Sequence, residues 1–334
     1  MSVTVRDIAR AAGVSTATVS RALRGFTTVD PAISEHVHRV AKRLDYIASP
    51  AAAALATGRT NTIGIITPYV SRWSFARMLS GIERELRASN VDLLLYCLGD
   101  PSDPHPAPPH QRLRKRVDAF VVMSVAAESP DLEGLFELGV PVTLIGSSAQ
   151  GSSSVMIDDF AGARTATEHL LAQGHVKVGL IYGRENRDPL VLERQRYLGY
   201  VAALESAGLG IDRTLEVPGS FTIDGGTHAM RRLLERPDPP TAVFAMSDEM
   251  AFGAIRAMRE AGVRPGPDIA VVGFDGHEMA DVFDLSTISQ PLEQLGVVAA
   301  RNILADLSTR DCAREAAVLP TELIVRGSSV AHAN

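Results

Sequence analysis

The sequence predicts an α/β protein with two parts: an N-terminal all-α helix-turn-helix domain, and a two-lobed domain of doubly wound parallel sheets. Helix caps and apolar residues at helical spacing mark three short helices before Leu44. From Asn61 onward, short β-rich runs alternate with helical stretches in two successive series. At 334 residues, the chain is also too long for one compact unit.

The first two predicted helices form the helix-turn-helix. Thr4 is placed to cap the first helix with Asp7 in its first turn, Gly13 supplies the positive φ of the turn, and Ser15 caps the second helix. One face of each helix is expected to be buried through Ile8, Ala9, Ala12, Val14, Val19 and Leu23. Asp30 then caps a third helix that runs to about Leu44.

The exposed face of the second helix fits the major groove of DNA. It presents short side chains and arginines, namely Thr16, Ala17, Ser20, Arg21 and Arg24. The alternative is a three-helix bundle that only packs. Charge favours DNA binding, because residues 1–60 have a net charge of +4 while the remaining 274 residues sum to −10.

Residues 49–58 carry every signal of a helix but span only about two turns. Ser49 is a cap, Pro50 takes the first helical position, four alanines follow, and Gly58 ends the run. Helices shorter than about 12–15 residues are marginal in water, so this one is expected to fold against a partner. Leu55 would then be an apolar wedge in the minor groove. An ordinary Ala-rich linker is the alternative.

Two series of strands and helices follow. In the first, strands are expected at 62–66, 91–96, 119–123 and 141–145, with helices near 75–88, 110–116 and 131–138. In the second, strands are expected at 154–157, 176–182, 241–246 and 269–274, with helices near 160–172, 189–207, 224–235 and 248–261. Nearly continuous apolar strands predict parallel sheets covered on both faces, with a ligand crevice at their carboxyl ends.

With these motifs, the chain resembles the LacI/GalR (lactose-repressor/galactose-repressor) family of bacterial transcription regulators. The motifs occur from end to end in the family's order: VRDIA (5–9), AGVSTATVSR (12–21), LDYI (44–47), GH (174–175), VVGFD (271–275) and LPTELIVR (319–326). One departure is Ala48-Ser49-Pro50, where the family usually has Pro-Asn. Ser caps a helix nearly as well as Asn does, so the helix start is expected to survive.

The resemblance implies a domain order and a set of DNA contacts. Residues 1–47 would be the helix-turn-helix DNA-binding domain, 48–60 the hinge helix and linker, and 61–330 a periplasmic-binding-protein type I-like domain for effector binding and dimerisation. Its N-lobe would comprise about 61–157 and 289–316, and its C-lobe about 158–288 and 317–330. The candidate DNA contacts are Thr4, Ser15, Thr16, Ala17, Thr18, Ser20, Arg21, Ala52 and Leu55.

The resemblance also implies where an effector binds. Relatives contact their effector at the positions of Trp73, Phe75, Arg196, Phe221, Ser247 and Asp275, and Ser124 is added because it follows a predicted strand. A carboxylate, a guanidinium and an aromatic face together suit a sugar. Core packing is the alternative for the aromatic residues, and an inter-helix salt bridge for Arg196. Purine-binding relatives depend on an arginine near residues 190–192, where this chain has Leu-Val-Leu.

These observations predict a sequence-specific DNA-binding transcriptional regulator, a repressor, controlled by a small carbohydrate-like effector bound between the lobes. Two copies are expected to bind a pseudo-palindromic double-stranded operator as a homodimer. After Arg326 there are no leucine heptads to build a tetramer. Alternatives are control by a nucleoside or purine, or by a protein co-regulator. A non-enzymatic sugar-binding receptor is the alternative from a different class.

No motif predicts catalysis, a cofactor or a metal site. The chain lacks a Gly-x-Gly-x-x-Gly after a strand, a phosphate-loop motif and a nucleophile elbow. Cys97 and Cys312 lack metal-ligand spacing and are expected to be packed free thiols. No apolar run approaches the ~20 residues of a membrane span, and the N-terminus has no secretory signal. We therefore expect a cytoplasmic, nucleoid-associated protein that does not bind membranes.

Overall fold

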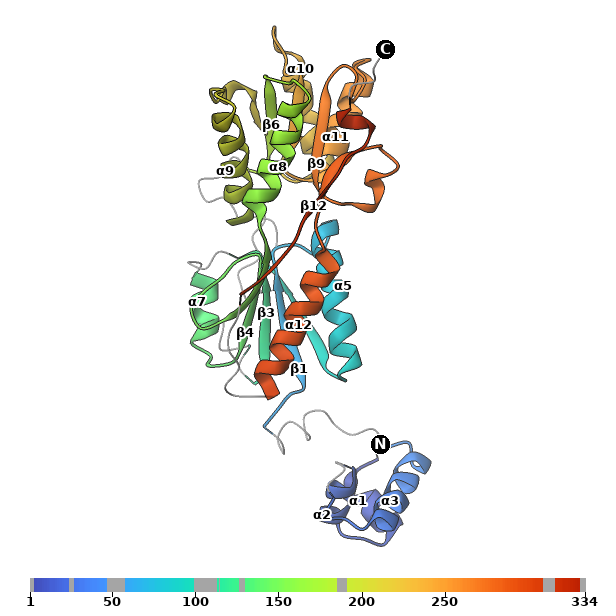
Figure 1. Cartoon of the computed structure of the whole chain (residues 1–334). Helices are drawn as coiled ribbons and strands as arrows, with labels where there is room; N and C mark the ends of the chain where they lie inside the picture. Colours follow the sequence, from blue (N-terminus) through green and yellow to red (C-terminus); the bar gives the residue numbers. More distant parts are fainter. Residues whose placement is uncertain are drawn as a thin grey trace. The chain divides into compact units, whose positions relative to one another are not determined.

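The computed structural model describes residues 3–23, 27–46, 58–98, 113, 115–125, 130–184, 191–308 and 316–330. The chain forms two compact units, Met1–Thr60 and Asn61–Asn334. Figure 1 shows the first unit as a small group of helices and the second as two sheets flanked by helices. In the described part of the chain, no helix is long and apolar enough to cross a membrane.

The first unit contains α1 (Val5–Ala12), α2 (Thr16–Leu23) and α3 (Pro31–Arg43). Thr4 and Asp7 form a capping box, in which each side chain accepts a hydrogen bond from the other residue's backbone N–H. Gly13 has a φ of 68°, and the Ser15 hydroxyl accepts a bond of 3.0 Å from the Thr18 N–H. The predicted helix starts are confirmed. The predicted apolar faces pack together around Ile8, Val19 and Val37.

The second unit contains two six-stranded sheets, and we call the parts built on them the N-lobe and the C-lobe. The N-lobe sheet has the order β11 (Ala316–Leu319), β5 (Ser153–Ile157), β4 (Val142–Ile145), β3 (Ala119–Met123), β1 (Thr62–Thr67) and β2 (Asp92–Cys97). The C-lobe sheet has the order β12 (Glu322–Ile324), β10 (Ser286–Ser289), β9 (Ala270–Asp275), β8 (Ala242–Ala245), β6 (Val178–Tyr182) and β7 (Glu216–Pro218). All described pairings are parallel except that of β10 with β12.

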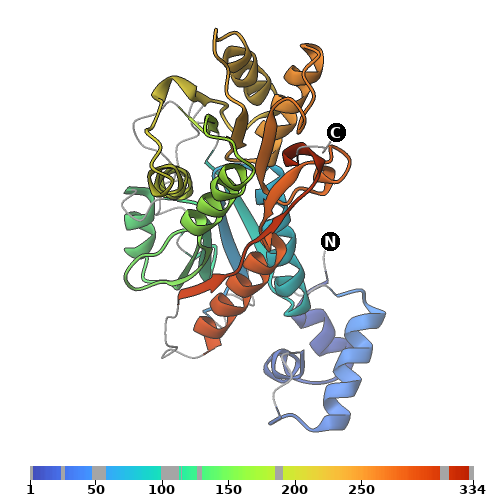
Figure 2. The same ribbon diagram turned by 45° about the horizontal axis from the view of Figure 1, so that its top comes forward.

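Helices cover the sheets of both lobes. The N-lobe carries α5 (Trp73–Ala88), α7 (Pro130–Phe136) and α12 (Leu292–Ser308), and the C-lobe carries α8 (Asp159–Ala172), α9 (Val191–Ser206), α10 (Ile223–Leu234) and α11 (Asp248–Glu260). Figure 2, like Figure 1, shows α12 beside α5. Glycine permits this close approach, since a Cβ on Gly296 would lie 2.0 Å from the Met78 carbonyl oxygen.

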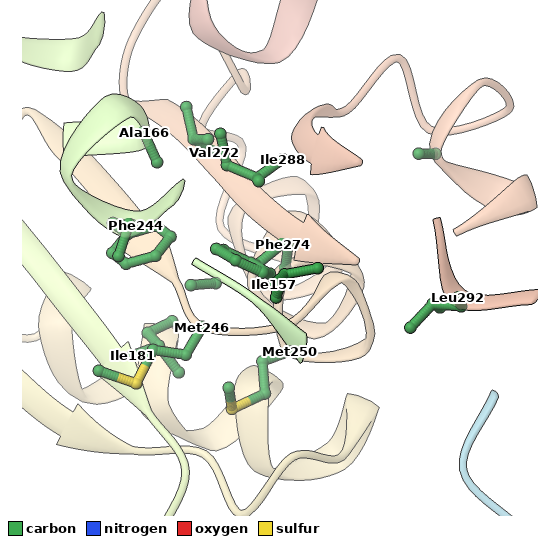
Figure 3. Packing of buried hydrophobic residues seen from close by; sticks show 14 of the residues in the cluster. Ile157, Ala166, Ile181, Phe244, Met246, Met250, Val272, Phe274, Ile288 and Leu292 are labelled. Atoms are coloured by element: carbon green, nitrogen blue, oxygen red, sulfur yellow. The ribbon is translucent and has the colours of Figure 1, made fainter. Parts of the chain in front are cut away.

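In the core of the C-lobe, buried apolar side chains pack around β8 and β9. Figure 3 shows the rings of Phe244 and Phe274 among aliphatic side chains that include Val272 and Ile288. The two ring centroids lie 6.5 Å apart, and both side chains are fully buried. Because β8 and β9 are buried on both faces, they are continuous apolar runs, as predicted.

The fold class is confirmed, with corrections to the elements. The sequence prediction omitted β7, β10, β11, β12 and α12, and it did not foresee the antiparallel edge strand. The missed strands have only three or four residues each, and β7, β10 and β12 also contain polar residues such as Glu216 and Ser286, so they lack the longer apolar run of a buried strand. α7 ends at Phe136 rather than at 138, and most of the helix expected at 110–116 lies outside the described residues.

Candidate functional site

A cavity that opens to solvent lies between the two lobes, at the carboxyl ends of the strands, with about 740 Å³ of empty space in and around it. Both sheets contribute polar side chains to it at these ends: Ser124 after β3, Asp159 after β5, Ser247 after β8, Asp275 at the end of β9 and Gln290 after β10. Strand ends of parallel sheets converge on one edge, so the topology brings together residues from distant parts of the sequence.

Six of the seven predicted effector-binding residues line this cavity: Phe75, Ser124, Arg196, Phe221, Ser247 and Asp275. Trp73 instead stacks on the ring of His277, with 4.3 Å between ring centroids. Phe75 is also part of the core and meets Tyr69 edge to face at 5.7 Å. That any of these seven residues binds an effector stays a prediction.

Arg196 links four elements at the floor of the cavity. Its Nε donates to Asp159 Oδ1 at 2.8 Å, and its Nη1 donates to the Met246 carbonyl at 2.6 Å. The guanidinium also lies 3.8 Å from Asp275 Oδ1 and 3.7 Å from the centroid of the Phe274 ring. Arg196 thus makes the inter-helix salt bridge, from α9 to α8, while it lines the cavity. Only 4 % of it is exposed.

The cavity holds buried carboxylates whose protonation is perturbed. Burial raises the pKa of Asp275 well above its usual value, against the opposing effect of Arg196. Burial raises the pKa of Asp159 in the same way, and that of Glu249 beside Arg72. Asp275 Oδ1 accepts a 2.7 Å bond from Gln290 Nε2, which fixes its orientation. Oxygens held in this way are suited to accept hydrogen bonds from hydroxyl groups.

Arg72, at the start of α5, connects the N-lobe to the C-lobe. It donates to the carbonyls of Phe221 and Ser220, and it lies 3.6 Å from the Glu249 carboxylate. Ser220 and Phe221 have φ values of 53° and 54°, a conformation that few side chains adopt without support. Since Phe221 lines the cavity, Arg72 holds a strained aromatic wall in place from the opposite lobe.

Replacing Arg72 by alanine is expected to loosen the contact between the lobes. The loss of two hydrogen bonds and an ion pair should cost about 1–3 kcal/mol of inter-lobe stabilisation. Trp73, the single tryptophan, follows Arg72 directly, so its fluorescence emission should shift toward that of a solvated indole. Arg77→Ala is the control, because Arg77 pairs with Glu293 inside the N-lobe at 2.7 Å. Equal emission shifts in the two variants would contradict the assigned role.

Sequence reasoning missed several residues of the cavity: Tyr69, Arg72, Asp159, Glu249 and Gln290. Asp159 closely follows a predicted strand, so its position after that strand could have indicated it, and Gln290 could have been found in the same way had β10 been predicted. Arg72 and Glu249 had no such signal, because their contact joins residues far apart in the chain.

The candidate DNA-binding surface lies on the first unit. Ser15, Thr16, Ala17 and Arg21 are exposed along α2, and Thr4 is exposed at the start of α1. Thr18 and Ser20 are partly buried, and the Thr18 and Ser15 hydroxyls lie 2.8 Å apart. Arg24, Ala52 and Leu55 lie outside the described residues. Contact of all these residues with DNA stays a prediction.

Cysteine placement corrects one expectation. Cys97 is a free thiol, as predicted, but it is exposed at the end of an edge strand rather than packed. Cys312 lies outside the described residues. Among the residues that the structure describes, no three His, Cys, Asp or Glu side chains form a group that could hold a metal ion.

Comparisons with known proteins agree with this architecture. Residues 4–49 match the family described as bacterial regulatory proteins, lacI family, and residues 167–329 match the periplasmic binding protein-like domain. The ribose operon repressor of Escherichia coli (strain K12) is 31% identical over 331 residues, which cover 98% of this chain and 99% of the relative.

Two solved structures extend the similarity to the fold. A complex of the transcriptional regulator CelR with cellobiose has 32% identity and a TM-score of 0.70, covering 98% of this chain and 99% of that one. The lac repressor dimer bound to operator and the anti-inducer ONPF has 26% identity and a TM-score of 0.87, covering 99% of this chain and all of that one (100%).

Proposed function

The chain belongs to the lacI family of bacterial regulatory proteins and is a DNA-binding transcriptional regulator, and from this premise we propose that it is a repressor controlled by a sugar bound between its lobes. The observation that carries the sugar assignment is the ring of polar side chains around Arg196, Asp159 and Asp275 beside the aromatic residues Phe75 and Phe221. Relatives named for ribose and solved with cellobiose support a carbohydrate.

Two copies of the chain would read the two halves of an operator. Each α2 would lie in the major groove, with Thr16, Ala17 and Arg21 toward the bases and Ser15 and Ser20 toward phosphates. The paired helices at 48–60 would enter the minor groove between the half-sites. The dimer of the lac repressor on its operator supports this arrangement. The proposed site of action is the nucleoid, in the cytoplasm. Regulation by DNA binding of this kind needs no catalytic activity.

The effector would act through the angle between the lobes. Ligand atoms between Asp275 in the C-lobe and Phe75 in the N-lobe stabilise one lobe arrangement over another. The operator affinity then changes only by the difference in effector affinity between the two arrangements. The contacts of Arg72 with Glu249 and Phe221, and the stack of Trp73 on His277, are inter-lobe interactions that such a movement would alter.

Effector affinity is expected to rise with pH. Sugar hydroxyls donate to ionised carboxylates, and burial raises the pKa values of Asp275, Asp159 and Glu249 in the ligand-free protein. Binding should therefore release protons, and the Kd should fall as the pH rises through the raised pKa values of these carboxylates. Calorimetric titrations in two buffers of different ionisation enthalpy measure the released protons. A Kd that is independent of pH would show that these carboxylates do not accept bonds from the ligand.

A thermal-shift screen tests the sugar assignment. The full chain would be screened against mono-, di- and amino-sugars, sugar phosphates and nucleosides. A ligand at about 100 times its Kd should stabilise the folded protein by about 2.7 kcal/mol. A saturable stabilisation by a sugar supports the proposal. Hits confined to nucleosides would overturn it, and so would silence across the panel, which would favour a protein co-regulator. Leu192 in the cavity wall argues against the nucleoside outcome.

A further inference from the structure

Asp248, the first residue of α11, is a fully buried carboxylate that does not line the cavity. Its Oδ1 accepts a 2.7 Å bond from the Thr287 hydroxyl, and its Oδ2 accepts a 2.7 Å bond from the His277 backbone N–H. Gly273 makes room for it, because a Cβ there would lie 2.1 Å from Asp248 Oδ1. Both bonds lead to segments that surround the end of β9.

The turn after β9 is strained and closely held. Asp275 has a φ of 137° and Gly276 a φ of 73°, so two successive residues adopt positive φ. The Gly276 N–H donates to the Thr287 hydroxyl at 3.3 Å, the same hydroxyl that donates to Asp248. A Cβ on Gly276 would lie 2.5 Å from the Ser289 hydroxyl. Strain of this kind persists only where neighbouring groups fix the conformation.

This turn carries two side chains that reach the cleft region. Asp275 lines the cavity, and His277 stacks on Trp73 of the opposite lobe. His277 is further supported by the edge of Phe252, at 5.2 Å between centroids. A change in the turn would therefore move a cavity carboxylate and an inter-lobe stacking contact together.

We propose that Asp248 is a positioning residue, which fixes the turn 275–277 through Thr287 and the His277 amide and thereby points Asp275 into the cavity and His277 toward Trp73. The geometry of the turn stands without any ligand. Only the consequence for effector recognition rests on the proposed function.

Several charged groups surround Asp248. Arg196 approaches from α9, Asp275 from β9, and Glu249 and His277 flank it on α11 and on the turn. Burial raises the pKa of Asp248 to about 6, partly offset by its hydrogen bonds. Below that pH the carboxyl gains a proton and loses acceptor capacity toward the turn. The pKa of Asp248 is raised in the folded state, so protonation of Asp248 does not itself lower the free energy of unfolding. We therefore expect the weaker hydrogen bonds to loosen the turn 275–277 and not the whole fold.

Amide hydrogen exchange in the ligand-free, full-length protein tests this role. In Asp248→Asn, the amides of Gly276 and His277 should exchange about ten- to a hundred-fold faster than in the wild type. Trp73 emission should shift as His277 moves. In the wild type, exchange corrected for its intrinsic pH dependence should show a step near pH 6, which the variant lacks. Glu193→Gln is the control, since Glu193 is another buried carboxylate of the C-lobe and accepts a hydrogen bond from the Arg184 N–H rather than from the turn.

Unchanged exchange at Gly276 and His277 in a folded Asp248→Asn protein would overturn the proposal, and so would equal acceleration in Glu193→Gln. If Asp248→Asn does not fold, Thr287→Val decides through the His277 amide, because it removes the Thr287 bond to Asp248 and keeps the carboxylate that accepts from the His277 N–H. The Gly276 amide is left out of this comparison, since it donates directly to the Thr287 hydroxyl. Faster exchange of the His277 amide in that variant supports the positioning role, and wild-type exchange refutes it. No effector is used, so a failure to find a sugar ligand leaves this result intact.

Discussion

Asp275→Ala is expected to abolish the response to the effector and to leave operator affinity unchanged. Asp275 is 8 % exposed, ends β9 at the edge of the cavity, and has its carboxylate fixed by Gln290. Alanine removes the acceptor oxygens, and the loss of one or two bonds to a charged group should weaken effector binding roughly a hundred-fold. The measurement is fluorescence anisotropy of labelled operator DNA, titrated with protein at increasing effector concentration.

A matched control keeps this result specific. Asp281→Ala removes a carboxylate from the same lobe, but one whose side chain is 87% exposed. This variant should respond to the effector as the wild type does. Since the first unit is untouched in both variants, both should bind operator with wild-type affinity in the absence of effector. A normal effector response in Asp275→Ala would remove Asp275 from the site.

Leu55→Ala is expected to weaken operator binding strongly without changing effector affinity. The hinge sequence at 48–60 predicts a helix that folds on DNA, and Leu55 is its one bulky side chain among alanines. Loss of an apolar wedge that holds base pairs unstacked should lower operator affinity by at least about ten-fold. The test is an anisotropy titration at matched salt concentration, because phosphate contacts make DNA affinity strongly salt-dependent.

Leu198→Ala is the control for the wedge. Leu198 is a leucine of the C-lobe, on α9, with 41% exposure. Its replacement should leave operator affinity unchanged. Operator affinity of Leu55→Ala equal to that of Leu198→Ala would show that the hinge leucine does not enter the groove.

The sequence was most informative where structure depends on neighbouring residues. The capping box of Thr4 with Asp7 and the positive φ of Gly13 arise from groups three or four positions apart, and both were predicted. The carboxylate of Asp275 could be placed at the cavity because Asp275 follows a predicted apolar strand and is the last residue of a family motif. Local patterns of this kind are readable without knowledge of the fold.

Long-range contacts were not readable. The stacking of the Trp73 indole on His277, more than 200 positions along the chain, was not predicted, and the predicted contact of Trp73 with an effector stays a prediction. Asp159 begins α8, and its bond to Arg196 on α9 was not predicted. Asp248 received no role of its own, since its partners Thr287 and His277 are brought to it only by the sheet order β10-β9-β8.

The most direct test of sugar-controlled repression is the operator Kd of the full chain with and without a saturating concentration of the stabilising sugar. The operator would first be selected by the protein from random-sequence DNA. Allosteric coupling between the cleft and the DNA-binding unit predicts a change in Kd of about ten-fold or more, lost in Asp275→Ala. An identical Kd in the presence and absence of a bound sugar would contradict the account, because the cleft would then not control DNA binding.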